Sequence, residues 1–333
     1  MTQSSKRIPT ILNSMFHHLV LFSILSVSFA QASADPAMDW IGKMSNAMRN
    51  LNYQGNFVYM HEGQLESMSI THINNELGES ERLLSLNGEA REVIRDNKNL
   101  TCIWPSSRKV VVDNSRQNTF SPLFIPDDIV RIGRHYELMM AGEDRVANHN
   151  AVIVHIRPRD QFRYGLKLWI NVDNSLLLKS ILINEHDQIV EQVMFTNIDL
   201  LADFEQLQMF ELPKIDDSFA MVRYHSGDAV ETLEADMIWQ FSNLPEGFRK
   251  ESALKRKVGE DGRFIQQMVY TDGLASLSVF IEKQTVQSSP GGTSMGAING
   301  YIYLIDNYSV TAIGEVPAVT VRQVAESVSF KMP

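Results

Sequence analysis

Apolar residues recur at every third or fourth position between residues 36 and 51, and then at every second position along much of the chain. The first spacing predicts one amphipathic helix, with Asp35 as its cap and Pro36 in its first turn. The second spacing predicts strands that bury one face. The first group of expected strands spans residues 53–61, 65–73, 79–86, 91–96, 100–104 and 109–113.

A second group of strands follows a loop in which a short helix is expected at residues 127–132. These strands are expected at residues 136–140, 151–156, 166–172, 176–184 and 189–198. So many consecutive strands without alternating helices favour a large, curved antiparallel sheet over a parallel α/β fold. If helices cover its concave face incompletely, the sheet keeps an elongated apolar groove that suits acyl chains or a peptide. A fully packed core without a groove is the alternative, and it stays open.

The periodicity fades in the acidic stretch after residue 200 and returns near residue 237. The later strands are expected at residues 237–241, 263–270, 274–282, 301–306 and 309–314, with a mobile hairpin loop at 287–300 and a final helix at 317–327. About 300 residues exceed what one hydrophobic core usually organises. We therefore expect a large antiparallel domain at residues 35–200, a connection at 201–236 and a small α+β domain at 237–333.

The first 34 residues have the pattern of an export signal. Lys6 and Arg7 precede an apolar stretch at residues 11–29, and small residues follow between Ala30 and Ala34. This arrangement predicts cleavage between Ala30 and Ala34. No cysteine follows the apolar stretch, so a lipid anchor has no acceptor. We expect a soluble protein of the periplasm.

The expected mature chain is acidic and has one cysteine. Without Lys6 and Arg7, the 30 basic residues fall to 28 against 40 acidic ones, a net charge of −12. This charge disfavours non-specific binding to nucleic acid or to anionic membranes. An intramolecular disulfide is excluded, so stability has to come from core burial. Because Cys102 lies inside an apolar strand pattern, we expect a small buried residue rather than a reactive thiol.

The motifs favour a binding protein over an enzyme. Residues 292–296 (GTSMG) match the G-x-S-x-G nucleophile elbow, but a strand-to-helix context is lacking and no histidine follows Ser294. His149 and His155 are too far apart on one strand to chelate one ion. We predict no enzyme activity, no cofactor and no metal. A hydrolase that uses Ser294 is the enzyme alternative.

Six segments in a fixed order resemble one protein family. They are residues 51–55 (LNYQG), 81–93 (ERLLSLNGEAREV), 164–170 (YGLKLWI), 244–248 (LPEGF), 270–279 (YTDGLASLSV) and 314–317 (GEVP). None is chemically diagnostic alone, but their order across both expected domains is specific. Over nearly the whole mature chain the sequence resembles the RseB/MucB family, which regulates the sigma-E (AlgU-type) envelope stress response.

The resemblance implies a curved half-barrel, similar to the lipoprotein carriers LolA and LolB, followed by a small domain. It also implies binding to the periplasmic domain of an RseA/MucA-type anti-sigma factor, which is thereby shielded from a site-1 protease of a DegS type. Lipopolysaccharide or lipoprotein acyl chains are expected to relieve the shielding. A periplasmic lipid or lipoprotein carrier without a regulatory partner is the alternative, and association into a homo-oligomer is left open.

The family supplies no short site signature, so the candidate ligand-binding residues rest on physical grounds. Phe57, Tyr59, Met68 and Ile70 occupy alternate strand positions and are suited to line a groove, with core packing as the commoner fate of such residues.

Basic residues are the candidates for contact with an acidic partner. Arg249, Lys250 and Arg256 are predicted to bind an acidic partner segment. Two basic clusters are each suited to an anionic lipid head group or to an acidic partner peptide, with an ordinary solvated surface as the alternative. One consists of Arg157, Arg159 and Arg163, and the other of Arg249 and Lys250 with residues 255–257.

Overall fold

The computed structural model describes residues 35–76, 78–96, 99–113, 132–201, 215–216, 218–224, 231–232, 239–258, 263–284 and 289–330. The export signal expected at residues 1–34 lies outside these residues, as do the loop after residue 113 and almost all of the short helix expected at 127–132. None of the helices in the described part of the chain is long and apolar enough to cross a membrane.

Helix α1 (Pro36–Asn50) forms as its sequence predicts. Asp35 Oδ1 accepts a hydrogen bond from the Ala37 amide at 2.9 Å, which caps the helix, and Pro36 occupies its first position. The apolar face buries Ile41 and Met44. This face packs against strands of the larger sheet and forms one side of its core.

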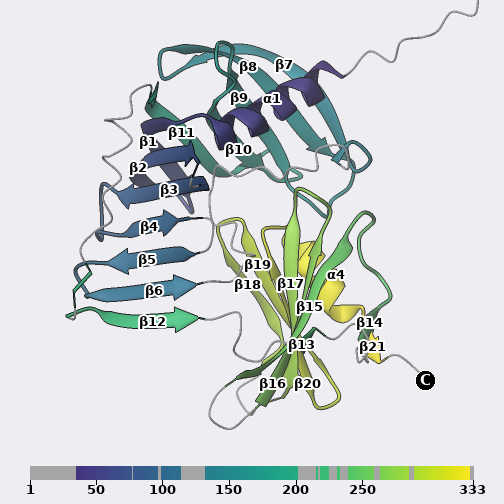
Figure 1. Ribbon diagram of the computed structural model, residues 1–333. Helices are drawn as coiled ribbons and strands as arrows, with labels where there is room; N and C mark the ends of the chain where they lie inside the picture. Colours follow the sequence, from purple (N-terminus) through teal and green to yellow (C-terminus); the bar gives the residue numbers. More distant parts are fainter. Residues whose placement is uncertain are drawn as a thin grey trace, which may run out of the picture. The chain divides into compact units, whose positions relative to one another are not determined.

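The larger sheet has twelve strands in the order β12-β6-β5-β4-β3-β2-β1-β11-β10-β9-β8-β7 (Figure 1). They are β1 (Tyr53–His61), β2 (Gln64–Asn75), β3 (Gly78–Ser85), β4 (Glu92–Arg95), β5 (Leu100–Trp104), β6 (Lys109–Asp113), β7 (Tyr136–Val146), β8 (His149–Pro158), β9 (Gly165–Asn171), β10 (Leu177–Ile183), β11 (Ile189–Leu200) and β12 (Ala220–Tyr224). The outermost described strands, β12 and β7, are not paired with each other, so the sheet is open, as a half-barrel requires. The predicted α+β, mostly antiparallel fold is confirmed.

Two features of this sheet were not predicted. Strand β12 lies within the stretch expected to be a connection, at residues 201–236, and pairs in parallel with β6. Strand β7 continues six residues beyond its predicted end and turns into β8 through Ala147 and Asn148, which have φ values of 49° and 67°. Its second half is polar and exposed, so no apolar alternation marks it.

The smaller sheet has seven strands in the order β13-β15-β16-β17-β20-β19-β18. They are β13 (Glu231–Thr232), β15 (Arg249–Val258), β16 (Arg263–Thr271), β17 (Ser276–Lys283), β18 (Gly291–Met295), β19 (Ile298–Ile305) and β20 (Tyr308–Gly314). Helix α4 (Ala318–Glu326) packs on one face, where Val321 and Val324 meet Val279, Val310 and Ala312 in one core cluster. A separate pair, β14 (Trp239–Phe241) and β21 (Val328–Phe330), completes the described elements.

The hairpin expected within residues 287–300 forms, but most of it is strand rather than loop. Residues 291–295 form β18, residues 296–297 turn, and β19 begins at Ile298. The sequence did not predict strand β18, because a strand of small polar residues has no apolar face to detect. Strand β15 was missed for a related reason, since its basic residues interrupt the alternation.

Candidate functional site

Three of the four predicted groove residues lie in the core of the larger sheet. Phe57, Met68 and Ile70 are 0%, 5% and 1% exposed and belong to the cluster that α1 covers. Phe57 faces Met68 across the strand pair, and its ring lies 5.6 Å from that of Phe195. Tyr59 is half-buried, and burial together with the Glu191 carboxylate raises the pKa of its hydroxyl. It stays a prediction that Phe57, Met68 and Ile70 line a groove. A ligand could contact them only if α1 moved away from the sheet.

An apolar row extends from this core along the rest of the sheet. Direct register partners on six neighbouring strands build it in the order Ile70, Leu83, Val93, Cys102, Val111 and Val222. Exposure increases along the row, from 1% at Ile70 and 4% at Leu83 to 39% at Val222, with the middle three residues half-buried. The row is therefore a surface on which an apolar ligand or partner can lie without any movement of α1.

Charged groups border the apolar row on the same face of the sheet. On one side, Lys109 lies over the Trp104 ring at 5.7 Å. On the other side, Arg95 Nη2 forms ion pairs with Glu81 Oε2 at 3.1 Å and with Glu79 Oε1 at 2.9 Å. An apolar strip with charged borders suits an amphipathic ligand, such as an acyl chain with a polar head group or one face of a peptide. Sequence reasoning missed the row because it considered each strand separately.

Cys102 sits in the middle of the apolar row as a free thiol. It is half-buried, not fully buried as its strand pattern suggested. Burial raises the pKa of the Cys102 thiol, so the protonated form prevails at neutral pH. A half-buried thiol with a raised pKa is a poor nucleophile, in agreement with the expectation that Cys102 is not reactive.

The predicted partner-binding residues share one strand. Arg249 and Lys250 begin β15 and are exposed, and Arg256 lies near its other end, where only the backbone is described. Seven residues of extended chain span about 23 Å, so these residues cannot form one compact site. A partner that contacts all three has to lie along β15, and this contact stays a prediction.

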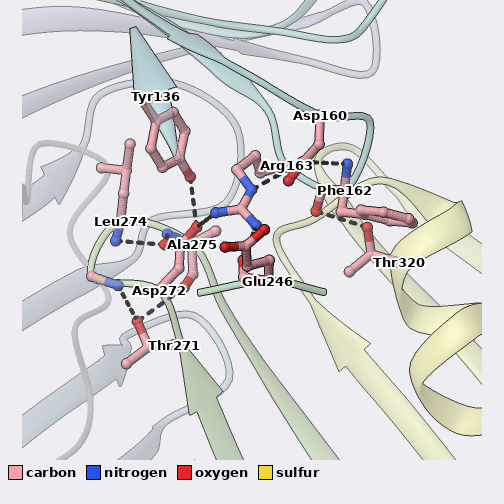
Figure 2. Close-up of polar contacts among 11 residues, drawn as sticks. Tyr136, Asp160, Phe162, Arg163, Glu246, Thr271, Asp272, Leu274, Ala275 and Thr320 are labelled. Atoms are coloured by element: carbon pink, nitrogen blue, oxygen red, sulfur yellow. Dashed lines mark hydrogen bonds and ion pairs between the residues drawn. The ribbon is translucent and has the colours of Figure 1, made fainter. Parts of the chain in front are cut away.

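Arg163, between β8 and β9, is the centre of a buried polar network (Figure 2). Its Nη1 donates to Asp272 Oδ2 at 2.6 Å, its Nη2 to the Glu246 carbonyl at 2.6 Å and its Nε to Asp160 Oδ1 at 3.1 Å. The Arg163 and Asp272 side chains have no exposed surface. Arg163 is therefore unavailable to an anionic head group, and its expected membership of a surface cluster is wrong.

Asp272, in the β16–β17 turn, uses both of its carboxylate oxygens. Tyr136 donates its hydroxyl to Oδ2 at 3.0 Å, and the amides of Leu274 and Ala275 donate to Oδ1 at 2.9 and 2.7 Å. Burial and the Asp272 charge raise the pKa of Tyr136. A buried ion pair is tolerated only when its remaining hydrogen bonds are satisfied, as they are here. The network thus fixes the β8–β9 loop to the β16–β17 turn.

A second contact joins the β18–β19 turn to the larger sheet. The amide of Gly296 donates to Glu62 Oε1 at 2.8 Å, and that of Ala297 donates to Glu191 Oε1 at 3.0 Å. Gly296 has a φ of 59°, and a Cβ there would lie 2.9 Å from Glu191 Oε1. The last glycine of GTSMG therefore serves this close approach. Ser294 lies on a strand that leads into a turn and another strand, so the nucleophile-elbow geometry is not formed.

The Glu315 carboxyl titrates under the influence of Glu191, one of the two carboxylates in this second contact. Burial, together with the Glu191 charge, raises the pKa of Glu315 to about 7 from 4.5. Because folding favours the protonated form, this contribution to stability is complete below pH 4.5 and is lost as the pH rises through about 7. Because Glu315 is exposed to solvent, screening weakens this effect, and we expect Glu315→Gln to raise the free energy of unfolding at pH 8 by less than about 1 kcal/mol.

Denaturant unfolding of wild type and Glu315→Gln from pH 4.5 to pH 8 measures this effect, and the difference between the two curves should grow with pH. Glu326→Gln, on the exposed surface of α4, is the control, because Arg322 lowers the pKa of Glu326 instead. A constant difference between wild type and Glu315→Gln would show that folding does not change the pKa of Glu315.

Two family models together match most of the chain. The model of the MucB/RseB N-terminal domain matches residues 36–214, and the model of the MucB/RseB C-terminal domain matches residues 234–329. The first spans the larger sheet up to β11, and the second spans nearly all of the smaller sheet, α4 and the β14–β21 pair.

Named relatives and solved structures cover the chain almost end to end. The sigma factor AlgU regulatory protein MucB of Pseudomonas aeruginosa is 30% identical over 93% of this chain and 95% of its own length. The sigma-E factor regulatory protein RseB of Escherichia coli K12 is 25% identical over 90% of this chain and 93% of its own length. The complex structure of Pseudomonas aeruginosa MucA/MucB has a chain that is 28% identical, with a TM-score of 0.69 over 90% of this chain and 100% of that one. A crystal structure of MucB with MucA(peri) matches at 28% identity and a TM-score of 0.68, over 89% of this chain and 100% of that one. The chain therefore belongs to the MucB/RseB family.

Proposed function

We propose that this protein is a periplasmic regulator that binds the periplasmic segment of a membrane anti-sigma factor and thereby delays its first proteolytic cut. The observation that carries the proposal is the similarity to MucB, in structures that contain MucA or MucA(peri), over about nine-tenths of the chain. The similarity includes both sheets, so the protein has the same parts from which a MucB-type complex is built.

Release of the partner by an amphipathic lipid is the second part of the proposal. The apolar row from Val93 to Val222 is partly exposed and bordered by charged groups, which suits an acyl chain with an anionic head group, as in lipopolysaccharide. A lipid can release the partner only if it binds the partner-free form more tightly than the bound form. Lipid and partner then compete, and no covalent step is required.

The test is a titration of the mature protein with the periplasmic segment of the anti-sigma factor from the same organism, with and without lipopolysaccharide. We expect saturable binding that lipopolysaccharide weakens about tenfold. A scrambled segment of the same composition is the control for charge alone.

Val222→Asp tests the lipid part separately, because Val222 is exposed and the substitution leaves the core intact. We expect this variant to bind the segment within about twofold of wild type while the lipid effect disappears. A segment that does not bind would reject the regulator. If acyl chains bind nonetheless, the same apolar row favours the alternative function of a periplasmic lipid or lipoprotein carrier.

A further inference from the structure

Strand β18 forms an exposed edge of the smaller sheet. All five of its residues, Gly291–Met295, are exposed, and its one neighbour in the described part of the chain is β19. The pairing with β19 runs from Gly291 opposite Ile302 to Met295 opposite Ile298 without a register shift. The outer side of β18 therefore presents a straight row of backbone donors and acceptors to solvent.

Three other described sheet edges have features that β18 lacks, and one of them, β12, carries exposed Arg223. Strand β7 has a register shift between Met140 and Gly142, and exposed Glu143, Asp144 and Arg145 follow on the strand. Strand β13 has two residues. Strand β18 has neither a charge, a proline nor a bulge along GGTSM. An edge of this kind is suited to pair with an extended chain segment.

Fixed carboxylates mark one end of β18. Gly296, directly after Met295, is held by Glu62, and Ala297 is held by Glu191. Neither Glu62 nor Glu191 has a basic side chain within ion-pair distance among the described residues. The two contacts hold the hairpin in place before any partner arrives, which lowers the entropic cost of pairing. The negative charge selects a basic residue in a partner that lies at this end of the strand.

The faces of β18 are open at its two glycines. A Cβ built on Gly291 meets no atom within 4 Å, and one built on Gly292 meets the Tyr301 ring at 3.6 Å. Met295 is 62% exposed and is the one large apolar side chain of the strand. The local chemistry therefore matches an extended segment of uncharged residues, with an apolar residue against Met295 and a basic residue beyond it.

We propose that β18 is a docking edge on which an extended segment of the anti-sigma factor adds as an eighth strand, with a basic residue at the Met295 end. This inference rests on the proposed function, since it names the surface that the partner uses. Recognition is mainly by backbone hydrogen bonds, so side-chain changes that keep the strand should have little effect.

Substitutions along β18 separate backbone pairing from side-chain contact in the full mature chain. Met295 and Ile298 close the two-residue turn as a hydrogen-bonded pair, and such pairs alternate along the strand, so the amides of Gly292 and Ser294 face away from β19. Ser294→Pro removes one of these outward amide hydrogens and Thr293→Lys adds a charge to the edge, and we expect each to weaken binding of the anti-sigma segment about tenfold. Thr293→Val has nearly the same shape and favours a strand, so it should bind within about twofold of wild type. Ser294→Ala should also bind like wild type.

Hydrogen exchange of the β18 amides in the wild-type protein gives a second readout that needs no variant. Saturation with the segment should slow the outward-facing amides of residues 291–295 about tenfold, while exchange along β7 stays unchanged. If Ser294→Pro lowers the melting temperature, binding by Thr293→Lys and the exchange data for the wild-type protein test the proposal instead.

The outcomes separate the two proposals. If the wild-type protein does not bind the segment, the proposed function and this inference both fail. If wild type binds but the Pro and Lys variants bind equally well and exchange is unchanged, β18 is not the docking edge and the regulator stands. Loss of self-association alone in these variants would also overturn the proposal, because the edge would then join two copies of this chain.

Discussion

Replacement of Asp272 by alanine is expected to lower the free energy of unfolding by about 3–5 kcal/mol, because it leaves a fully buried guanidinium without its carboxylate. Arg163 would keep the Glu246 carbonyl and Asp160 as partners, but neither supplies a buried negative charge. The same change leaves the Tyr136 hydroxyl and two backbone amides without an acceptor. Denaturant unfolding at pH 7 measures the loss.

Two variants control this experiment. Tyr136→Phe removes one hydrogen bond and retains the ion pair, so it should cost about 1 kcal/mol. The double variant Arg163→Met with Asp272→Leu removes both charges, and it should recover much of the stability that Asp272→Ala loses. A loss below about 1 kcal/mol for Asp272→Ala would mean that water enters and solvates the guanidinium.

Phe57→Ala should cost about 3–5 kcal/mol in unfolding free energy, because the ring is 0% exposed and packs in the core beneath α1. A ring that lined an open groove would already contact water, and its removal would cost much less. Tyr59→Ala, a half-buried position two residues along the same strand, is the matched comparison and should cost less than Phe57→Ala. Thermal and denaturant unfolding of the two variants show which substitution causes the larger loss of stability.

This pair of variants tests the predicted groove without assuming where lipid binds. A large stability loss for Phe57→Ala, with unchanged acyl-chain binding by the folded fraction, assigns Phe57 to the core. A loss of acyl-chain binding with little change in stability would assign it to a groove and overturn the core interpretation.

The strands that sequence predicted best are those with one buried face. Strands β1, β5 and β6 begin and end at the predicted residues, because alternation of period two is strong in each. Strands β15 and β18 and the second half of β7 were missed, since backbone pairing at or near a sheet edge needs no apolar alternation. Strand β12 was missed because its partner β6 lies far back in the sequence.

The buried network was beyond sequence reasoning for a different reason. Arg163 and Asp272 are 109 residues apart, and no periodic pattern relates two loop residues at that separation. Arg163 therefore resembled a surface cation near other arginines. A signal did exist, because Glu246 and Asp272 both lie in the short segments on which the family resemblance rests.

The alternation of apolar and polar residues correctly identified Phe57 and Met68 as inward-facing. It cannot distinguish a core from a groove, since both require apolar residues.

The pairing of β1 with β11 imposes an order on folding. The runs β1–β6 and β7–β11 each consist of neighbouring hairpins, whereas Tyr53 pairs with Leu200, which lies 147 positions further along the chain. Closing so long a loop is entropically costly and slow compared with forming local hairpins. The two halves should therefore form first and join last. Until they join, each half exposes the apolar face that the finished core buries, so this interval is when a newly made chain is most vulnerable to aggregation and proteolysis.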